Sequence, residues 1–170
     1  MMQGSYLKWT AGCLLSLLCL PGIAASAGQK RPERQTVPLT AGELYTLYAD
    51  KTWTWDTGGG RFIGDGRRMV AWVNDKGMQS LAEGSWSVDD NGQFCMRGLW
   101  SNKAGSARAS TCFGHRKVGA TIYQRRQPAG HWYVFKHARP RSGDEFNKLV
   151  ASDTVSKKAS DLKQVLMAEK

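Results

Sequence analysis

The fold of this chain is decided by the stretch between residues 94 and 113. It reads Phe94-Cys95-Met96-Arg97-Gly98-Leu99-Trp100, then a polar loop, then Arg108-Ala109-Ser110-Thr111-Cys112-Phe113. Two short strand-like runs that flank a polar turn predict a β-hairpin. Placing Cys95 opposite Cys112 gives one largely apolar face, which pairs Phe94 with Phe113, Met96 with Thr111, Gly98 with Ala109 and Trp100 with Ala107. A slip of one residue would mix the two faces, so the hydrophobic pattern and the cysteine pairing indicate the same register.

The first 27 residues have the three-part layout of a secretory signal peptide. Lys8 precedes an apolar run over residues 9–24, and Ala25-Ser26-Ala27 forms a small-x-small cleavage site. A membrane anchor is the alternative, but the run is short for a bilayer span of roughly 20 residues and Pro21-Gly22 interrupts it. We expect a periplasmic or secreted protein after cleavage near Ala27.

Cleavage would leave two cysteines in the mature chain. Cys13 and Cys19 lie in the segment that is removed, whereas Cys95 and Cys112 remain. An even pair of cysteines in an oxidising compartment predicts a disulfide. The predicted hairpin is therefore covalently stapled.

Four segments divide the chain: a signal peptide (1–27), a flexible lead-in (28–38), a β-domain (39–138), and a basic linker with a C-terminal helix (139–170). Thr40 and Glu43 form a capping box, which predicts a short helix that ends near Asp50. From Thr52 the pattern alternates with a period of two. Beyond the central hairpin, predicted strands cover residues 52–56, 61–64, 67–74, 79–88, 119–127 and 131–137, and Gly58-Gly59-Gly60 is predicted to turn the chain.

These elements predict a mainly β protein of about eight short antiparallel strands, with a short N-terminal helix and a C-terminal helix. Short connections favour antiparallel neighbours in sequence order. The sheet is then an up-and-down, lipocalin-like barrel or a strongly curved sheet. We favour the closed barrel because closure removes exposed sheet edges.

Six short motifs occur in order along the predicted β-domain. They are Trp53-x-Trp55, Gly58-Gly59-Gly60-x-Phe62, Glu83-Gly84-x-Trp86, Cys95-x4-Trp100, Thr111-Cys112-Phe113-x-His115 and Trp132-Tyr133-x-Phe135. Over roughly Leu39 to Ala138 the chain resembles the domain of unknown function 995 family, which comprises small exported proteins of alphaproteobacteria. The resemblance implies export and a β-domain, and it implies no activity.

The residues give little support for catalysis or for a cofactor. No Gly-x-Ser-x-Gly motif is present, the two cysteines are expected to be bridged, and most acids lie at turns. Glu83 is the acid inside a strand, and a buried pair with an arginine such as Arg97 is its simplest role. His131 and His137 stand roughly 20 Å apart on one strand, too far to share an ion. We predict a protein that is not an enzyme and has no metal site or cofactor.

A net charge of +10 indicates either an anionic partner or a surface that is basic for solubility alone. Basic and aromatic residues alternate near the end of the predicted domain. Guanidinium groups suit carboxylate and phosphate, and aromatic faces suit sugar rings or apolar chains. The predicted ligand-binding residues are Arg116, Tyr123, Arg125, Arg126, Trp132 and Tyr133. Export favours an anionic polysaccharide or a lipid headgroup as partner, and it argues against nucleic acid.

The sequence thus predicts a non-catalytic binding module for an acidic ligand of the cell envelope. The alternative is a structural or inhibitory protein that docks on an envelope protein. The C-terminal helix carries a narrow apolar stripe of Val155, Ala159, Leu162 and Leu166 among lysines. Such a helix either packs on the domain or touches a membrane surface.

Overall fold

The structure is a computed structural model that describes residues 35–169. The predicted signal peptide, its cleavage site and most of the predicted lead-in lie outside the described residues. Within those residues, no helix is both long enough and apolar enough to cross a membrane. These residues form one compact unit.

The first helix, α1 (Ala41–Tyr48), begins at the predicted capping box. The backbone N–H of Glu43 donates to Oγ1 of Thr40 at 3.2 Å, and the backbone N–H of Thr40 donates to Oε2 of Glu43 at 3.0 Å. Both bonds satisfy amides that have no partner inside the helix. Leu44 and Tyr48 are fully buried on one face, as the helical spacing predicts.

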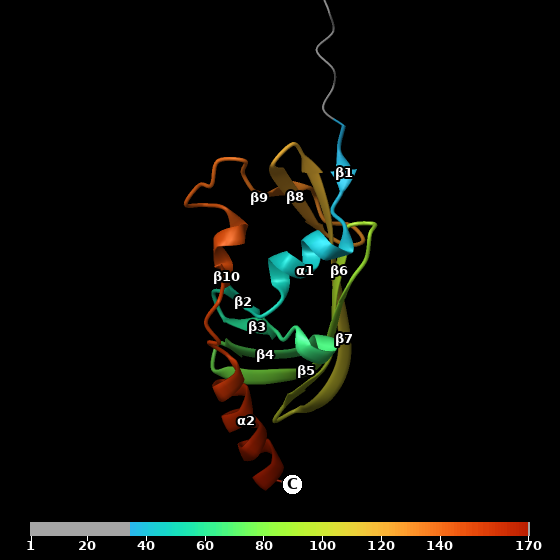
Figure 1. Cartoon of the computed structure of the whole chain (residues 1–170). Coiled ribbons are helices and arrows are strands. Elements are labelled where there is room, and N and C mark those ends of the chain that lie inside the picture. Colours follow the sequence, from blue (N-terminus) through green and yellow to red (C-terminus); the bar gives the residue numbers. More distant parts are fainter. Residues whose placement is uncertain (1–34, 170) are drawn as a thin grey trace, which may run out of the picture. The chain divides into compact units, whose positions relative to one another are not determined.

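Ten strands form a single antiparallel sheet (Figure 1). They are β1 (Val37–Pro38), β2 (Lys51–Trp55), β3 (Gly58–Phe62), β4 (Arg68–Asp75), β5 (Met78–Val88), β6 (Gln93–Asn102), β7 (Gly105–Val118), β8 (Thr121–Arg126), β9 (Tyr133–Lys136) and β10 (Leu149–Val150). The order is β10-β2-β3-β4-β5-β6-β7-β8-β9, and β1 pairs with β7. The predicted mainly β fold with sequential antiparallel neighbours is confirmed.

The sheet is curved and open. In the described part of the chain, β9 and β10 stand at the two ends of the strand order and do not pair with each other. The curved sheet that we considered therefore holds, and the closed barrel that we favoured does not. The short helix η2 (Glu145–Lys148) lies at this seam, where Phe146 packs edge-on against Phe135 of β9. At this seam, aromatic side-chain packing takes the place of backbone hydrogen bonds between strands.

The central hairpin has the predicted register. Phe94 faces Phe113, and Cys95 faces Cys112. The two sulfur atoms are bonded at 2.08 Å, so the predicted disulfide is confirmed. Phe94, Met96 and Trp100 point to the inner, concave side of the sheet, and the cysteines belong to the opposite side.

The glycine run does not turn the chain, which corrects our prediction. Gly58, Gly59 and Gly60 lie in β3 and pair with both β2 and β4, and the turn falls at Asp56-Thr57. A Cβ at Gly58 would lie 2.0 Å from the carbonyl oxygen of Trp72. Neighbouring backbone therefore approaches too closely for any side chain, a use of strand glycine that composition alone does not distinguish from a turn.

The core lies between α1 and the inner face of the sheet. Tyr48 stacks on Phe94, with ring centroids 3.9 Å apart. Phe62 meets both rings edge-on, and Trp53 and Phe135 complete the cluster. Offset and edge-to-face aromatic pairs each add about 0.5–1.5 kcal/mol beyond area burial. The short helix thus holds the curved sheet by one aromatic side chain inserted at its centre.

Residues 139–155 are part of the domain, although we predicted a linker there. β10 pairs with β2, where Leu149 faces Trp53. The indole N–H of Trp53 also donates to Oε1 of Glu145 at 2.9 Å. A two-residue strand carries too little pattern to be recognised in the sequence.

The second helix, α2 (Ser156–Ala168), packs on the outer face of β4 and β5 (Figure 1). Ala159 and Leu162 are buried against Leu81, so most of the predicted apolar stripe faces the sheet. Lys163 pairs with Glu83 at 2.7 Å. Glu83 is therefore exposed and bound to the helix, and our prediction of a buried pair with Arg97 is wrong.

Candidate functional site

Positive charge is concentrated in one part of the sheet. Residues 91–143, which contain β6 to β9, hold ten Lys and Arg and no Asp or Glu. The rest of the chain holds fourteen residues of each kind, so this segment accounts for the whole net charge of +10. Two of the ten, Lys103 and Lys117, pair with Glu169 and Glu43, and the remaining bases concentrate anions near this half of the sheet.

Two arginines of this half lie over one tryptophan. The guanidinium carbon of Arg116 is 5.2 Å from the ring centre of Trp132, and that of Arg125 is 4.9 Å from it. Arg116 comes from β7 and Arg125 from β8, and Trp132 immediately precedes β9. Cation–π contacts of this kind contribute about 0.5–1 kcal/mol when exposed. The ring therefore holds two like charges close together.

Gly114 provides the space for this arrangement. It faces Arg125 across the β7–β8 pairing. A Cβ at Gly114 would lie 3.5 Å from the Trp132 ring and 3.0 Å from Nε2 of Gln127. A larger side chain would displace both groups. The absence of a side chain at Gly114 lets the indole lie close to the strand and under the arginines.

The two arginines have no acidic partner. Among residues 35–169, neither side chain forms a salt bridge or donates a hydrogen bond. Nε of Arg125 is buried and also has no partner there. A guanidinium carries five N–H donors, and a buried donor without a partner costs about 1–3 kcal/mol. The site therefore has unused donors and an excess of positive charge, both of which an anion would satisfy.

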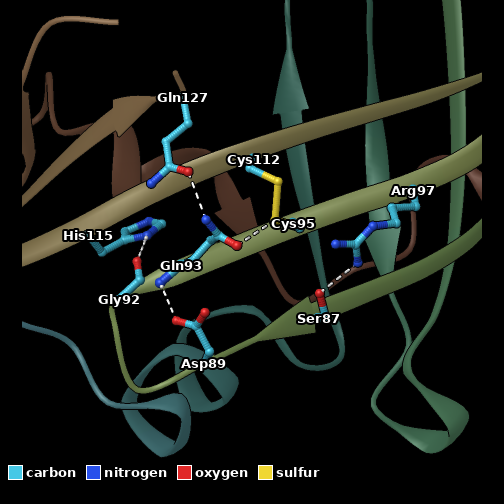
Figure 2. Close-up of a disulfide and its surroundings, with 9 residues drawn as sticks. All are labelled: Ser87, Asp89, Gly92, Gln93, Cys95, Arg97, Cys112, His115 and Gln127. Carbon is cyan, nitrogen blue, oxygen red and sulfur yellow. Dashed lines mark hydrogen bonds between the residues drawn. A yellow bond between two sulfur atoms is a disulfide. The ribbon is translucent and has the colours of Figure 1, made fainter. Parts of the chain in front are cut away.

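The disulfide lies beside the side chain of Gln93, which is bonded to Gln127 (Figure 2), and Gln127 follows Arg125 by two residues. The side chain of Gln93 donates to Oε1 of Gln127 at 2.8 Å, and Oε1 of Gln93 lies 3.3 Å from Sγ of Cys95. The backbone N–H of Gln127 donates to the carbonyl of Cys112 at 2.8 Å. The end of β8 is thus tied to the stapled hairpin directly beside Arg125.

Four of the six predicted ligand-binding residues meet on the outer face. Tyr123 faces Arg116 in the β7–β8 register and joins Arg125 and Trp132 there. Arg126 faces Phe113 and so belongs to the inner side, where its side chain is exposed. Tyr133 faces Gln124 and is also on the inner side. Strand alternation separates the adjacent Arg125 and Arg126, which their shared charge does not reveal.

Tyr133 ends a hydrogen-bonded chain that runs into the core. Its hydroxyl donates to Oε1 of Gln124, whose Nε2 donates to Oη of Tyr48 at 2.8 Å. The hydroxyl of Tyr48 lies 2.8 Å from Nε2 of His115, and Nδ1 of His115 lies 3.3 Å from the carbonyl of Gly92. Because a carbonyl can only accept, Nδ1 carries the hydrogen, and Nε2 is the acceptor for two donors, the Tyr48 hydroxyl and Nε2 of Gln124 at 2.7 Å. All four side chains are thereby satisfied.

Burial shifts the pKa values along this chain. Burial lowers the pKa of His115 to about 4, so the imidazole is neutral at pH 7. Burial raises the pKa of Tyr48 well above its ordinary value. Burial, with the charge of Glu145, raises the pKa of Tyr133 to about 12. Both phenols are then protonated donors at pH 7. The hydrogen-bonded chain is therefore uncharged and has a structural role in the core.

Two further arginines on the outer face were not among the ligand-binding residues that we predicted. Arg97 faces Ser110 and Arg108 faces Leu99 in the central hairpin, on the side that carries the disulfide. Both are exposed. The signal that points to them is the long run without an acid, which is visible in the sequence once acids are mapped separately from bases.

The site is suited to holding an anion. Among the described residues, no three His, Cys, Asp or Glu side chains gather where they could bind a metal ion. The groups that converge are guanidiniums, an indole and a tyrosine on a rigid β-surface. Such groups bind carboxylate or phosphate through charge-assisted hydrogen bonds.

The fold and the site together define a class: a disulfide-stapled antiparallel half-barrel with a basic outer face. A family model described as a protein of unknown function (DUF995) matches residues 15–155, and the chain belongs to this family. The match continues past Ala138, where we ended the β-domain, and includes β10. No curated protein and no solved structure matches the chain.

Proposed function

We propose that this protein is an exported, non-catalytic binding module that holds an acidic ligand of the cell envelope at the Arg116–Trp132–Arg125 surface. The observation that carries the proposal is the pair of guanidiniums over Trp132 without an acidic partner in the described residues. A pair of like charges held together by one ring is more stable when an anion neutralises it. The surface therefore favours carboxylates and phosphates over neutral ligands.

Export rests on two observations. The Cys95–Cys112 bond requires an oxidising compartment to persist, which the cytoplasm of most cells does not provide. The N-terminal residues also have the signal-peptide pattern described above. In that compartment, acidic polysaccharides and lipid headgroups are the abundant anions, and both present carboxylate or phosphate groups.

Calorimetric titration of the purified protein tests the proposal. The probes are a uronic acid oligosaccharide, a neutral oligosaccharide of equal length, and vesicles with or without an anionic phospholipid. Each is measured near 0.01 M and near 0.15 M salt, where the Debye length falls from about 30 Å to about 8 Å. We expect binding to one anionic probe alone, weaker at the higher salt concentration. Equal binding of neutral and anionic probes, or no binding near 0.01 M salt, would overturn the proposal.

Two variants assign the binding to the site. Replacing Arg116 and Arg125 with Gln removes both charges above Trp132. Arg67→Asn is the matched control, because Arg67 also lies over aromatic rings, those of Tyr45 and Trp86, but belongs to the short helix η1 (Asp65–Arg67). Arg67 has a φ of 48°, a conformation that Asn tolerates. The double variant is expected to lose most of the binding, and the control is expected to retain it.

The second candidate is a structural or inhibitory protein that docks on an envelope protein. The filled core favours it: α1 occupies the concave side, and the pocket beside the core under Trp55 and Trp100 measures only about 50 Å³. A small ligand would then find no room inside the sheet. Co-purification of one stoichiometric protein from the periplasm, released by Arg116 and Arg125 replacement, would favour this candidate over an acidic glycan or lipid.

A further inference from the structure

We infer that the acidic ligand is an unbranched polyanionic polysaccharide that lies along the outer face of β6 and β7. This inference rests on the proposed function and names its ligand class. The basic surface does not stop at Trp132. It continues past the disulfide to Arg97 and Arg108, and we call these two residues the distal pair and Arg116 with Arg125 the proximal pair.

The register places the two pairs along one line. Side chains at positions 108, 110, 112, 114 and 116 of β7 share the outer face. Arg97 lies beside position 110, and Arg125 lies beside position 114. At about 3.3 Å per residue, the line from Arg108 to Arg116 is about 26 Å long. The Cys95–Cys112 bond lies at its middle and ties β6, which carries Arg97, to β7.

The distal pair lines a groove in the protein surface. This groove of about 510 Å³ is lined by Arg97, Leu99, Arg108 and Ser110 of the hairpin and by the middle of β5, the strand next to β6. Nη1 of Arg97 donates to Oγ of Ser87 at 3.1 Å, which orients its guanidinium (Figure 2). Arg108 forms no salt bridge and no side-chain hydrogen bond among residues 35–169. Glu83 also lines the groove, but Lys163 neutralises it.

The shape and chemistry of the line favour a polysaccharide over other polyanions. A single lipid headgroup would engage one pair and leave the other unused. Single-stranded nucleic acid is bound by aromatic side chains that stack on successive bases. Between the Trp132 ring, which lies over Gly114, and the distal pair, the outer face carries Gln93, the disulfide and Ser110, and no aromatic ring among the described residues. Arginine forks separated by polar and small residues fit carboxylates that repeat along a sugar chain.

Chain length is the measurement that tests this inference. The probes are a galacturonic acid dimer, which reaches one pair, and a galacturonic acid oligomer long enough to cover about 26 Å. Linking two sites on one rigid surface raises affinity by far more than doubling the ligand concentration, because the second contact is intramolecular. We expect the long oligomer to bind at least about tenfold more tightly per molecule than the dimer.

Replacement of the distal pair separates this inference from the proposed function. In the variant with Arg97→Gln and Arg108→Gln, the long oligomer is expected to lose that advantage of about tenfold, while the dimer binds as before. Replacement of the proximal pair is expected to weaken both. Lys76→Asn is the matched control: it removes one exposed charge from the β4–β5 turn, at a φ of 49° that Asn accepts.

Each outcome has a distinct meaning. If the distal variant binds the long oligomer as Lys76→Asn does, the extended line is wrong and the proximal site stands. If neither uronate binds the unmodified protein near 0.01 M salt, the inference fails, and anionic vesicles then decide the proposed function. If a thymidine oligonucleotide of the same length binds as tightly as the uronate oligomer, the choice of polysaccharide is overturned.

Discussion

The two halves of the sheet use their faces differently. In β2 to β5, the inner face packs on α1 and the outer face of β4 and β5 packs on α2. In β6 to β8, the inner face packs on the same core, but the outer face carries the disulfide and arginines that have no acidic partner among residues 35–169. Lys163 of α2 neutralises the acid Glu83 on β5, whereas residues 91–143 contain no acid at all. The first half packs on helices on both of its faces, whereas the second half packs on its inner face and exposes charged side chains on its outer face.

The largest effect is expected in the packed half, at Gly58. The Cβ of Gly58→Ala would lie 2.0 Å from the carbonyl oxygen of Trp72, so β3 and β4 must separate. Overpacking usually costs about 1–3 kcal/mol, and a clash with backbone lies at or above the upper end. We expect the free energy of unfolding to fall by about 3 kcal/mol or more, measured by urea denaturation. Uronate binding by the fraction that remains folded should be unchanged.

Gly42→Ala is the matched control for that substitution. A Cβ at Gly42, inside α1, has no heavy atom within 4 Å. Alanine in a helix interior is about 0.5–1 kcal/mol more stable than glycine, so this variant should be stabilised. Equal effects of the two substitutions would mean that close strand approach does not explain the glycines of β3.

The next effect is expected in the charged half, at the disulfide. Replacing Cys95 and Cys112 with Ser opens a loop closed over a separation of 17 residues, and the free energy of unfolding should fall by about 3 kcal/mol. The variant would also lose the covalent link between β6 and β7 midway between the two arginine pairs, so the two strands can shift more easily there. We therefore expect long-oligomer binding to weaken more than dimer binding. A melting temperature that a reducing agent leaves unchanged would contradict the stability effect.

The sequence was sufficient for the features that rest on repeated patterns. Period-two alternation and the cysteine pair predicted the register of the central hairpin, because a slip by one residue would bury Arg97 instead of Met96. The capping box at Thr40 predicted the start of α1, because it depends on side chains three residues apart. Local rules of this kind need no knowledge of the rest of the fold.

The features that we missed depend on tertiary contacts. Gly58 lies in a strand because Trp72, fourteen residues later, approaches it closely. Leu149 and Val150 form a strand because β2 has a free edge, and two residues alone carry no period. In the candidate site, alternation separates Arg126 from Arg125, and Gly114 admits the ring of Trp132. These facts require a register and a turn path that sequence patterns do not define.

A pH effect of about 2–3 kcal/mol is expected from the buried imidazole of His115, which contacts Tyr48 of α1 and Gln124 of β8. Burial lowers the pKa of His115 to about 4, from about 6.5 in the unfolded chain. Between these values the unfolded state binds the extra proton, so stability is present above pH 6.5 and is lost as the pH falls towards 4. Urea denaturation between about pH 7.5 and pH 4.5 measures this loss.

Two variants separate the imidazole from other groups. His115→Gln should flatten the dependence over that range, even if it lowers stability at every pH. Tyr48→Phe keeps the imidazole but removes the hydroxyl that donates to its Nε2. This variant should lose about 1–3 kcal/mol at neutral pH and keep the dependence. An equally steep dependence in His115→Gln would assign it to carboxyl groups instead.

The smallest effect on stability is expected on the free face itself. Arg108 is exposed, has no acidic partner among the described residues and belongs to a segment with ten positive charges. Removing its charge reduces repulsion, so Arg108→Gln should leave the free energy of unfolding within about 0.5 kcal/mol of the original value, or raise it slightly.

Lys157→Gln gives the contrasting result on α2, because it breaks the pair between Lys157 and Asp161, whose charged atoms are 2.7 Å apart. This exposed pair is spaced four residues apart on the helix, and its loss should lower stability by about 0.3–0.5 kcal/mol. Raising the salt concentration from about 0.01 M to about 0.15 M screens both the repulsion around Arg108 and the attraction between Lys157 and Asp161. Because repulsion dominates in a chain of net charge +10, the melting temperature of the unmodified protein should rise, and the difference between the two variants should shrink. A loss of more than about 1 kcal/mol in Arg108→Gln would mean that this arginine is already used inside the fold, and the β6–β7 face would then not be free for a ligand.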